Sequence, residues 1–439
     1  MCPIRFSSAV TGKIGLRPWL GHTPDKRIFT GILENAMNLP TTLLSMRKSA
    51  LRAVALALLV LVMPPAGAET VPEPTGKRLR VLVAENFPDG NVFIGAAAHG
   101  KSVVNNPLVA TILDREFSYI TPANDLKQST VHPEPDVWNW DLAFMWLRHA
   151  RDQNQLLRVH GPISPQISTW AKEDNRTRPE LLENMTSFLK AGCDIYSGNE
   201  RVRWLDVINE TILEDGSWHM PKEGSERYEN PWGAIGLDND AQKTPLYISK
   251  AFEIATKYCG GIKLLINQNH LTPAAAEKMK YLVGYIRGKG FRVDGIAWQG
   301  HITTGWEKDE NNMRLLDDLI TWAHKNNLEF HISEFQSNLH TRVEMFSKRK
   351  KLPLKVTEAE LRSRYPAQAK TFAAVLELLL RHRNGGVVAI NYWHVLNSEA
   401  MNKDGNLFED NGVPRPAYYA VQNLLEHPPA PIRSKPAGR

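Results

Sequence analysis

Short apolar runs alternate with longer amphipathic stretches along most of the chain. Eight runs rich in Val, Ile, Leu and aromatic residues predict buried strands, at residues 92–99, 117–124, 156–163, 202–209, 262–269, 294–301, 328–335 and 386–396. Between them, apolar residues at helical spacing predict helices, among them 181–192, 274–290, 315–327 and 369–386. Eight strands that alternate with helices are typical of an α/β fold, the (β/α)8 TIM barrel. A doubly wound open sheet is the competing architecture.

Polar residues gather where the predicted strands end. In the stretch WLDVINET (204–211), four apolar residues lead into Asn209 and Glu210, which are costly to bury without partners. Other strand ends contribute amide, imidazole and carboxyl groups, at Asn124, His160, Asn267, Gln299, His301 and Glu334. Because the carboxyl ends of barrel strands meet on one rim, where active sites lie in this fold, we expect these side chains to line one cleft.

Two glutamates at the ends of the fourth and seventh predicted strands, Glu210 and Glu334, would lie across this cleft from each other. Glycoside hydrolysis needs such a pair. One carboxyl group protonates the leaving oxygen, and the other, ionised, meets the positive charge that develops at the anomeric carbon. A separation of about 5 to 5.5 Å would give retention of configuration. For either glutamate alone, a salt-bridged residue on the rim is the alternative interpretation.

Several stretches match one family pattern in the same order. WLDVINE (204–210) is similar to a W-D-V-x-N-E motif with one residue inserted after the Trp, and ISEFQ (332–336) to a strand that ends T-E-L-D. Four others follow the pattern: EFSYITPANDLK (116–127), GIAWQGHI (295–302), NYWHVL (391–396) and LFEDNGVPRPAYYAVQ (407–422). Together they resemble the family 10 glycoside hydrolases, which are mostly endo-β-1,4-xylanases on a (β/α)8 barrel.

The resemblance implies that Glu210 is the acid/base and Glu334 the nucleophile of a retaining enzyme. The acid role requires Glu210 to hold a proton near the working pH. We expect nine further residues to bind the polysaccharide, xylan or a related β-glycan: Asn124, Lys127, His160, Gln166, Asn209, Asn267, Gln299, His301 and Trp393. The resemblance implies that Asn124 and Lys127 contact the glycone, the part of the substrate on the non-leaving side. Trp393 falls where the family has the Trp of its W-G motif, under the sugar that is cleaved.

Some of these roles follow from the residues themselves. His301 lies two residues beyond Gln299 and therefore points to the same face of its strand. A histidine that hydrogen-bonds a carboxylate keeps it ionised, although a structural histidine is the alternative interpretation. Asn209, beside Glu210, can donate to a sugar 2-hydroxyl. Asp206 points to the other face, and we expect it to support a neighbouring strand.

The sequence departs from the family pattern around the sugar-binding positions. Ala123 stands where the family has Glu, Gln128 where it has Trp, and Gln336 and Asn397 where it has Asp. A lost neutral hydrogen bond costs about 0.5 to 1.5 kcal/mol, far less than the catalytic carboxylates supply. The changes therefore predict an altered substrate preference. A β-glycanase for another polysaccharide and a non-catalytic carbohydrate-binding protein remain alternatives.

The N-terminal region has the pattern of an export signal. After Met46 come a basic start, an apolar run at 53–63 and the small residues Ala66-Gly67-Ala68, which predict a signal peptide at 46–68 and a secreted or periplasmic protein. The apolar run is too short for a membrane span. We expect residues 1–45 to be an upstream extension, 69–91 a lead-in, 92–427 the single catalytic domain and 428–439 a Pro-rich tail.

Charge and cysteine content exclude other classes of function. The sequence has 53 Lys and Arg against 47 Asp and Glu, but residues 1–68 hold eight and two of these, which leaves 45 of each. The basic excess disappears with the leader, so nucleic-acid binding is not expected. Cys193 and Cys259 are free to pair or to stay reduced. No metal-binding spacing occurs, the chemistry needs no cofactor, and we expect a monomer.

The segment from Thr211 to Pro245 is long for a connection between a strand and a helix. It carries Trp218, Tyr228 and Trp232, whose rings suit stacking on sugar faces. Two interpretations stay open: the rings shape the aglycone side of the cleft, where the leaving sugars bind, or they pack the loop onto the barrel.

Overall fold

The computed structural model describes residues 71–173, 177–221, 230–350, 352, 356–399 and 404–432. The predicted upstream extension and signal peptide, and most of the predicted C-terminal tail, lie outside these residues. Internal contacts separate residues 1–70 from a unit of residues 71–439, and the second unit is the one described below.

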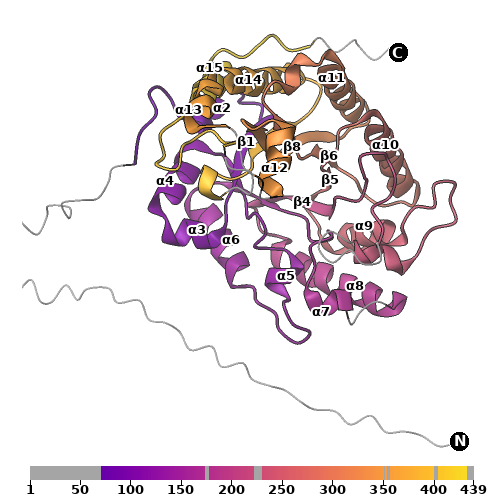
Figure 1. Ribbon diagram of the computed structural model, residues 1–439. Helices are drawn as coiled ribbons and strands as arrows, with labels where there is room; N and C mark the ends of the chain where they lie inside the picture. Colours follow the sequence, from indigo (N-terminus) through magenta and orange to yellow (C-terminus); the bar gives the residue numbers. More distant parts are fainter. Residues whose placement is uncertain are drawn as a thin grey trace, which may run out of the picture. The chain divides into compact units, whose positions relative to one another are not determined.

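The strands form a closed parallel barrel, as the sequence predicts (Figure 1). They are β1 Val92–Ala97, β2 Tyr119–Thr121, β3 Leu156–Val159, β4 Val202–Asn209, β5 Lys263–Gln268, β6 Gly295–Trp298, β7 His301–Thr303, β8 Glu329–Asn338 and β9 Val388–Tyr392. The order β6-β5-β4-β3-β2-β1-β9-β8 is closed by the pairing of β6 with β8. This closure excludes the open doubly wound sheet.

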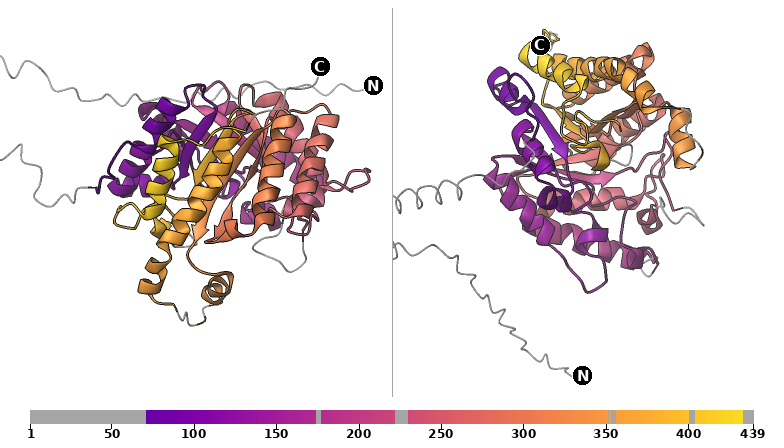
Figure 2. Two further views of the ribbon diagram at one scale, coloured as in Figure 1. Left: turned by 90° about the horizontal axis from the view of Figure 1, so that it is seen from above. Right: turned by 60° about the vertical axis from the view of Figure 1, so that its left-hand side comes forward.

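Helices surround the barrel (Figures 1 and 2). They are α2 Leu79–Asn86, α3 Gly100–Asn105, α4 Pro107–Glu116, α5 Gln128–Val131, α6 Asp141–Asp152, α7 Thr169–Glu173, α8 Arg178–Tyr196, α9 Leu246–Tyr258, α10 Pro273–Gly288, α11 Glu310–Lys325, α12 Arg342–Arg349, α13 Glu358–Ser363, α14 Tyr365–Arg381 and α15 Pro416–Glu426. Short 3-10 turns lie at Pro231–Ile235, Trp306–Lys308 and Asn397–Glu399. Helices α12 and α13 project beyond one end of the barrel (Figure 2). Among the described residues, none of the helices has the length and apolar character of a membrane span.

The predicted sixth strand, 294–301, is wrong as one continuous element. It is broken into β6, which pairs with β5 and β8, and β7, which pairs with β8 alone. The break lies at Gly300, whose φ is +80°, and a Cβ atom there would approach Ile332 Cγ2 to 2.7 Å. Only glycine fits such a close, left-handed turn. The turn lets Gln299 and His301 both reach the cleft.

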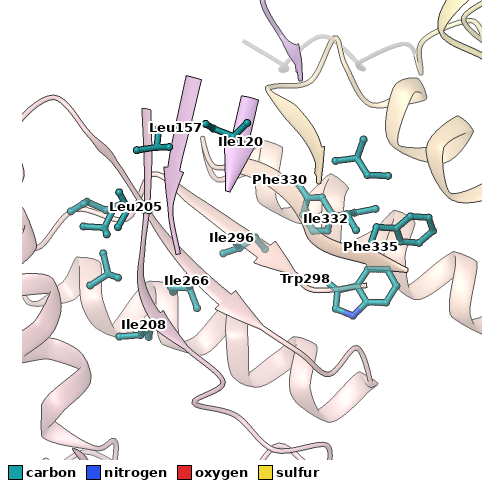
Figure 3. Packing of buried hydrophobic residues seen from close by; sticks show 14 of the residues in the cluster. Ile120, Leu157, Leu205, Ile208, Ile266, Ile296, Trp298, Phe330, Ile332 and Phe335 are labelled. Carbon is teal, nitrogen blue, oxygen red and sulfur yellow. The ribbon is translucent and has the colours of Figure 1, made fainter. Parts of the chain in front are cut away.

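Two apolar clusters follow from the alternation of side chains along the strands. The larger lies between barrel and helices; it includes Ile120, Leu157, Ile266, Ile296 and Phe330 (Figure 3). Strand residues of the opposite alternation point inward, where Tyr119, Trp204, Leu265, Ala297 and Ala389 form the smaller cluster. Burial on both faces explains why most residues of the strands are apolar.

Two contacts tie distant helices together. A disulfide joins Cys193 of α8 to Cys259 at the end of α9, which resolves the question that the sequence left open. Near the N-terminus, the buried Glu116 carboxylate accepts hydrogen bonds from Leu79 N of α2 and from the Tyr418 hydroxyl of α15. The lead-in before β1 is therefore packed onto the barrel.

Candidate active site

Glu210 directly follows β4 and has a left-handed backbone, with a φ of +57°. Consecutive residues of a strand normally point to opposite faces. Here the unusual backbone brings both Asn209 and Glu210 to one partner: Gln299 Nε2 donates to Asn209 Oδ1 (3.2 Å) and to Glu210 Oε1 (3.0 Å). Non-glycine residues in this region of φ cost of order 1–3 kcal/mol and cluster at functional sites. The Glu210 side chain is half-buried.

Glu334 lies within β8, where the pairing with β9 shifts register between Ile332 and Phe335. Its carboxylate is almost fully buried. Oε2 lies 3.1 Å from His301 Nε2, and Oε1 lies 3.5 Å from His160 Nε2. Asn267 Nδ2 also donates to Oε1 at 3.1 Å. The structure therefore places the predicted His301 contact as expected.

The surroundings of Glu334 favour its ionised form. Burial by itself raises the pKa of this carboxyl group, but the neighbouring His160, His301 and Lys127 outweigh burial and hold the pKa at about 2. A carboxyl group with this pKa is a carboxylate at any ordinary working pH.

A chain of hydrogen-bonded amides connects the two carboxylates. Besides its bond to Gln299, Asn209 Oδ1 accepts a hydrogen bond from Asn267 Nδ2 at 2.9 Å. Asn267 in turn reaches Glu334, so the chain runs through Glu210, Gln299, Asn209, Asn267 and Glu334. Four predicted site residues and the acid/base candidate thus lie together in one hydrogen-bonded chain.

A buried ionic network lies beneath the two carboxylates. Asp206 binds Arg158 through both carboxylate oxygens and lies 3.0 Å from His160 Nδ1. Because His160 also contacts Glu334, Asp206 orients it through the other ring nitrogen. Arg158 continues to His331, which contacts Glu329. Asp206 supports the neighbouring strand β3, as predicted, whereas no pattern in the sequence indicated that His331 and Glu329 join this network.

Comparison with known proteins identifies the family. The family model described as glycosyl hydrolase family 10 matches residues 83–424. The chain belongs to glycosyl hydrolase family 10. The resemblance found in the sequence is thereby confirmed, and the protein is a glycoside hydrolase.

The relatives of this family 10 hydrolase are distant in sequence. It is 24% identical to endo-1,4-beta-xylanase B of Thermotoga neapolitana over 389 residues, 84% of this chain and 96% of that one. It is 27% identical to endo-1,4-beta-xylanase A of Caldicellulosiruptor saccharolyticus, over 78% of this chain and 96% of that one. Xylanase 10B from Thermotoga petrophila, solved with xylobiose, has the same fold, with a TM-score of 0.63, 23% identity and coverage of 81% and 99% of the two chains.

On the side of the family 10 cleft formed by β2 and β3, Lys127 Nζ donates to Gln166 Oε1 at 2.6 Å. Burial lowers the pKa of Lys127, although the negative charges of Glu210, Glu334 and Asp206 oppose this effect. Lys127 is thus close enough to interact electrostatically with both catalytic candidates, Glu210 and Glu334. Asn124 shapes the same turn through its backbone: its carbonyl oxygen accepts from Lys127 N.

Trp393 follows β9, and both its backbone N–H and its carbonyl group are hydrogen-bonded. Its N–H donates to Phe335 O, and its carbonyl accepts from Gln336 Nε2, which also donates to Asn406 Oδ1. The indole ring lies edge-to-face against His160 at 5.3 Å and His301 at 6.3 Å. Gln336, which replaces the family Asp, therefore supports the loop that carries Trp393.

Two of the residues considered in connection with sugar binding are buried away from solvent. Gln128, the replacement of a family Trp, is fully buried and donates to Asn184 Oδ1. Trp232 is fully buried as well, and its Nε1 donates to Ser164 O at 2.9 Å. Of the two interpretations left open for Trp232, the structure therefore supports the second: this ring packs the loop onto the barrel. Trp218 is half-buried beneath Lys278, and Tyr228 lies outside the described residues.

A groove that the sequence did not reveal continues from His301, away from Lys127. Its volume is about 320 Å³, and it is lined by loops after β5 and β7 and by α11 and α12. Trp306 stands in its wall, with its ring 5.3 Å from the buried Trp298 ring. Three amides, Asn269, Asn311 and Asn312, also line it. The sequence signal was a second tryptophan five residues beyond His301.

Proposed function

We propose that the enzyme is a retaining, endo-acting β-1,4-xylanase with Glu334 as nucleophile and Glu210 as acid/base. The observation that carries this proposal is the hydrogen-bonded connection of two carboxylates in different surroundings at the barrel rim. The named xylanases among its relatives support xylan as the substrate.

In the first step, a Glu334 oxygen attacks the anomeric carbon, and the glycosidic C–O bond breaks as Glu210 gives its proton to the leaving oxygen. The product is a glycosyl ester of Glu334. In the second step, Glu210 takes a proton from water while the water oxygen attacks the same carbon and releases the Glu334 carboxylate. Two inversions give net retention.

Asn209 is oriented to stabilise these steps. Its Oδ1 atom already accepts hydrogen bonds from Asn267 and Gln299. The Nδ2 group is therefore the part of the amide left to meet substrate. Beside Glu210, it would donate to the sugar 2-hydroxyl, a bond that strengthens in the transition state.

Endo action requires sugar-binding surface on both sides of the scissile bond. Lys127 and Gln166 provide polar groups on the glycone side. The groove beyond His301 supplies the opposite side, with Trp306 as a platform on which a sugar ring can stack. Its volume falls within the usual range of ligand sites, about 300 to 1,000 Å³.

The test uses residues 69–439, xylan and a panel of other β-glycans. We expect new reducing ends within xylan chains and, by NMR of the first products, the β anomer before mutarotation. The Glu334→Ala variant, checked for folding by circular dichroism, is the control. First formation of the α anomer would contradict retention, and release of single sugars from chain ends alone would contradict endo action. Faster cleavage of another β-glycan would identify that polysaccharide, and not xylan, as the preferred substrate.

Export is part of the proposal. The pattern at 46–68 supports removal of a signal peptide and a mature chain that begins at Glu69. N-terminal sequencing of the protein recovered from outside the cytoplasm of its host tests this, and an N-terminus upstream of Met46 would contradict it.

A further inference from the structure

The residue after Trp393 adopts a backbone conformation that most side chains avoid. His394 has a φ of +76°, in the left-handed region where glycine fits without cost. Glycine is also the residue that the family W-G motif has at this place. Strain of this kind persists where the surrounding structure enforces it, and it clusters at functional sites. A contact made by the His394 side chain should therefore explain why histidine, and not glycine, occupies this position.

Hydrogen bonds of the His394 ring do not explain its presence. The His394 side chain is 4% exposed, and its Nδ1 atom is buried without a hydrogen-bond partner among the described residues. Burial and the nearby His99 hold its pKa at about 3, so the ring is neutral under ordinary conditions. A buried histidine kept for structure normally has partners for its ring nitrogens.

Ring packing offers a better explanation. The His394 ring lies 5.2 Å from the Trp393 ring in an edge-to-face arrangement, and on its other side 5.1 Å from the His99 ring. His99 Nδ1 lies 3.5 Å from Asp125 Oδ1. The other oxygen of Asp125 is held by Gly100 N and Trp146 Nε1. Asp125, His99 and His394 thus form a row that ends on Trp393.

Trp393 is consequently enclosed by three imidazole rings. His160 and His301, whose rings also lie edge-to-face with Trp393, are the two histidines beside Glu334. We propose that His394 is a positioning residue, braced by His99, which fixes the Trp393 ring beneath the reacting sugar and for which the strained backbone is retained. This inference rests on the proposed function.

The test combines His394→Gly, which removes strain and ring together, with His394→Asn, which tolerates the left-handed backbone but lacks the ring. On 4-nitrophenyl β-xylobioside, we expect kcat/KM to fall about 10- to 100-fold in both, because small displacements of a sugar from its reactive position are costly. Asn327→Gly is the matched control. Asn327 also has a positive φ, +54°, but lies before β8, away from the rim, and we expect unchanged kinetics.

A double-mutant cycle separates positioning from general packing. If His394 acts through Trp393, His394→Asn in a Trp393→Ala background should cause less than about a twofold further loss. Losses that multiply, or single variants that match the wild type, would overturn the inference. If His394→Gly fails to fold, His394→Asn carries the test. A wild type without activity on any β-xyloside would instead overturn the proposed function.

Discussion

The ends of β4 and β8 carry the same side chain in opposite surroundings. Glu334, on β8, is almost fully buried and contacts two imidazoles and an amide. Glu210, after β4, is half-buried and accepts a hydrogen bond from the uncharged amide of Gln299. The surroundings of Glu334 stabilise a carboxylate, whereas the hydrogen-bond donor of Glu210 is uncharged. One barrel rim thus gives two glutamates different neighbours, which is what the two proposed tasks require.

Removal of Glu334, the proposed nucleophile, should have the largest effect and gives the sharpest test of the difference between the two glutamates. We expect Glu334→Ala to lower kcat/KM on 4-nitrophenyl β-xylobioside at least about 10⁴-fold, roughly 5.5 kcal/mol. Azide, which can enter the space left by the carboxylate, should restore turnover and yield the α-glycosyl azide, because it attacks from the face that Glu334 occupied. A β-glycosyl azide from this variant would reverse the two assignments.

Removal of Glu210, the proposed acid/base, should have an effect that depends on the leaving group. We expect Glu210→Ala to slow the cleavage of xylo-oligosaccharides by about 10²- to 10⁴-fold, since a sugar alkoxide cannot leave without a proton. An aryl group leaves without that help, so the glycosyl-enzyme should accumulate. Azide should then release the β-glycosyl azide. Equal losses on xylo-oligosaccharides and on 4-nitrophenyl β-xylobioside, which has an aryl leaving group, would contradict the acid role. Glu85→Gln, an exposed carboxylate of α2 paired with Lys77, serves as the folded control.

Much of the fold could be predicted because the information is local. Buried parallel strands are apolar until their last residues, so their number, order and polar ends are readable from the sequence. Asn209, Asn267, Gln299 and His301 were found for this reason, and the structure brings them together around the two glutamates.

Features that depend on contacts between distant segments could not be predicted. Arg158 and His331 occupy the middle of apolar strands, and only the closed barrel brings them face to face. The disulfide required the packing of α8 against α9. The interruption at Gly300 depends on the close approach of Ile332, which no property of the local sequence indicates.

Removal of a histidine beside Glu334 should change the pH dependence of catalysis. The depressed pKa of Glu334, about 2 against an ordinary 4.5, contributes stability that is present above the ordinary value and is lost as the pH falls toward 2. Loss of the His301 hydrogen bond and charge raises this pKa. We expect the acid limb of kcat/KM for His301→Ala to move to higher pH, measured from about pH 3 to 8. His427→Ala, an exposed histidine after α15, should leave the profile unchanged.

The smallest effect tests whether the groove beyond His301 belongs to the cleft. Trp306→Ala should lower kcat/KM on xylohexaose about 2- to 10-fold, the value of one aromatic stacking contact of about 0.5 to 1.5 kcal/mol. The same variant should cleave 4-nitrophenyl β-xylobioside normally, because that substrate places no sugar on the leaving side. Phe144→Ala removes a ring of α6 that is 47% exposed near the loop before β4, at the opposite end of the barrel, and should affect neither substrate. Equal losses on both substrates would show that Trp306 supports the catalytic centre, and unchanged rates on both would place the leaving sugars elsewhere.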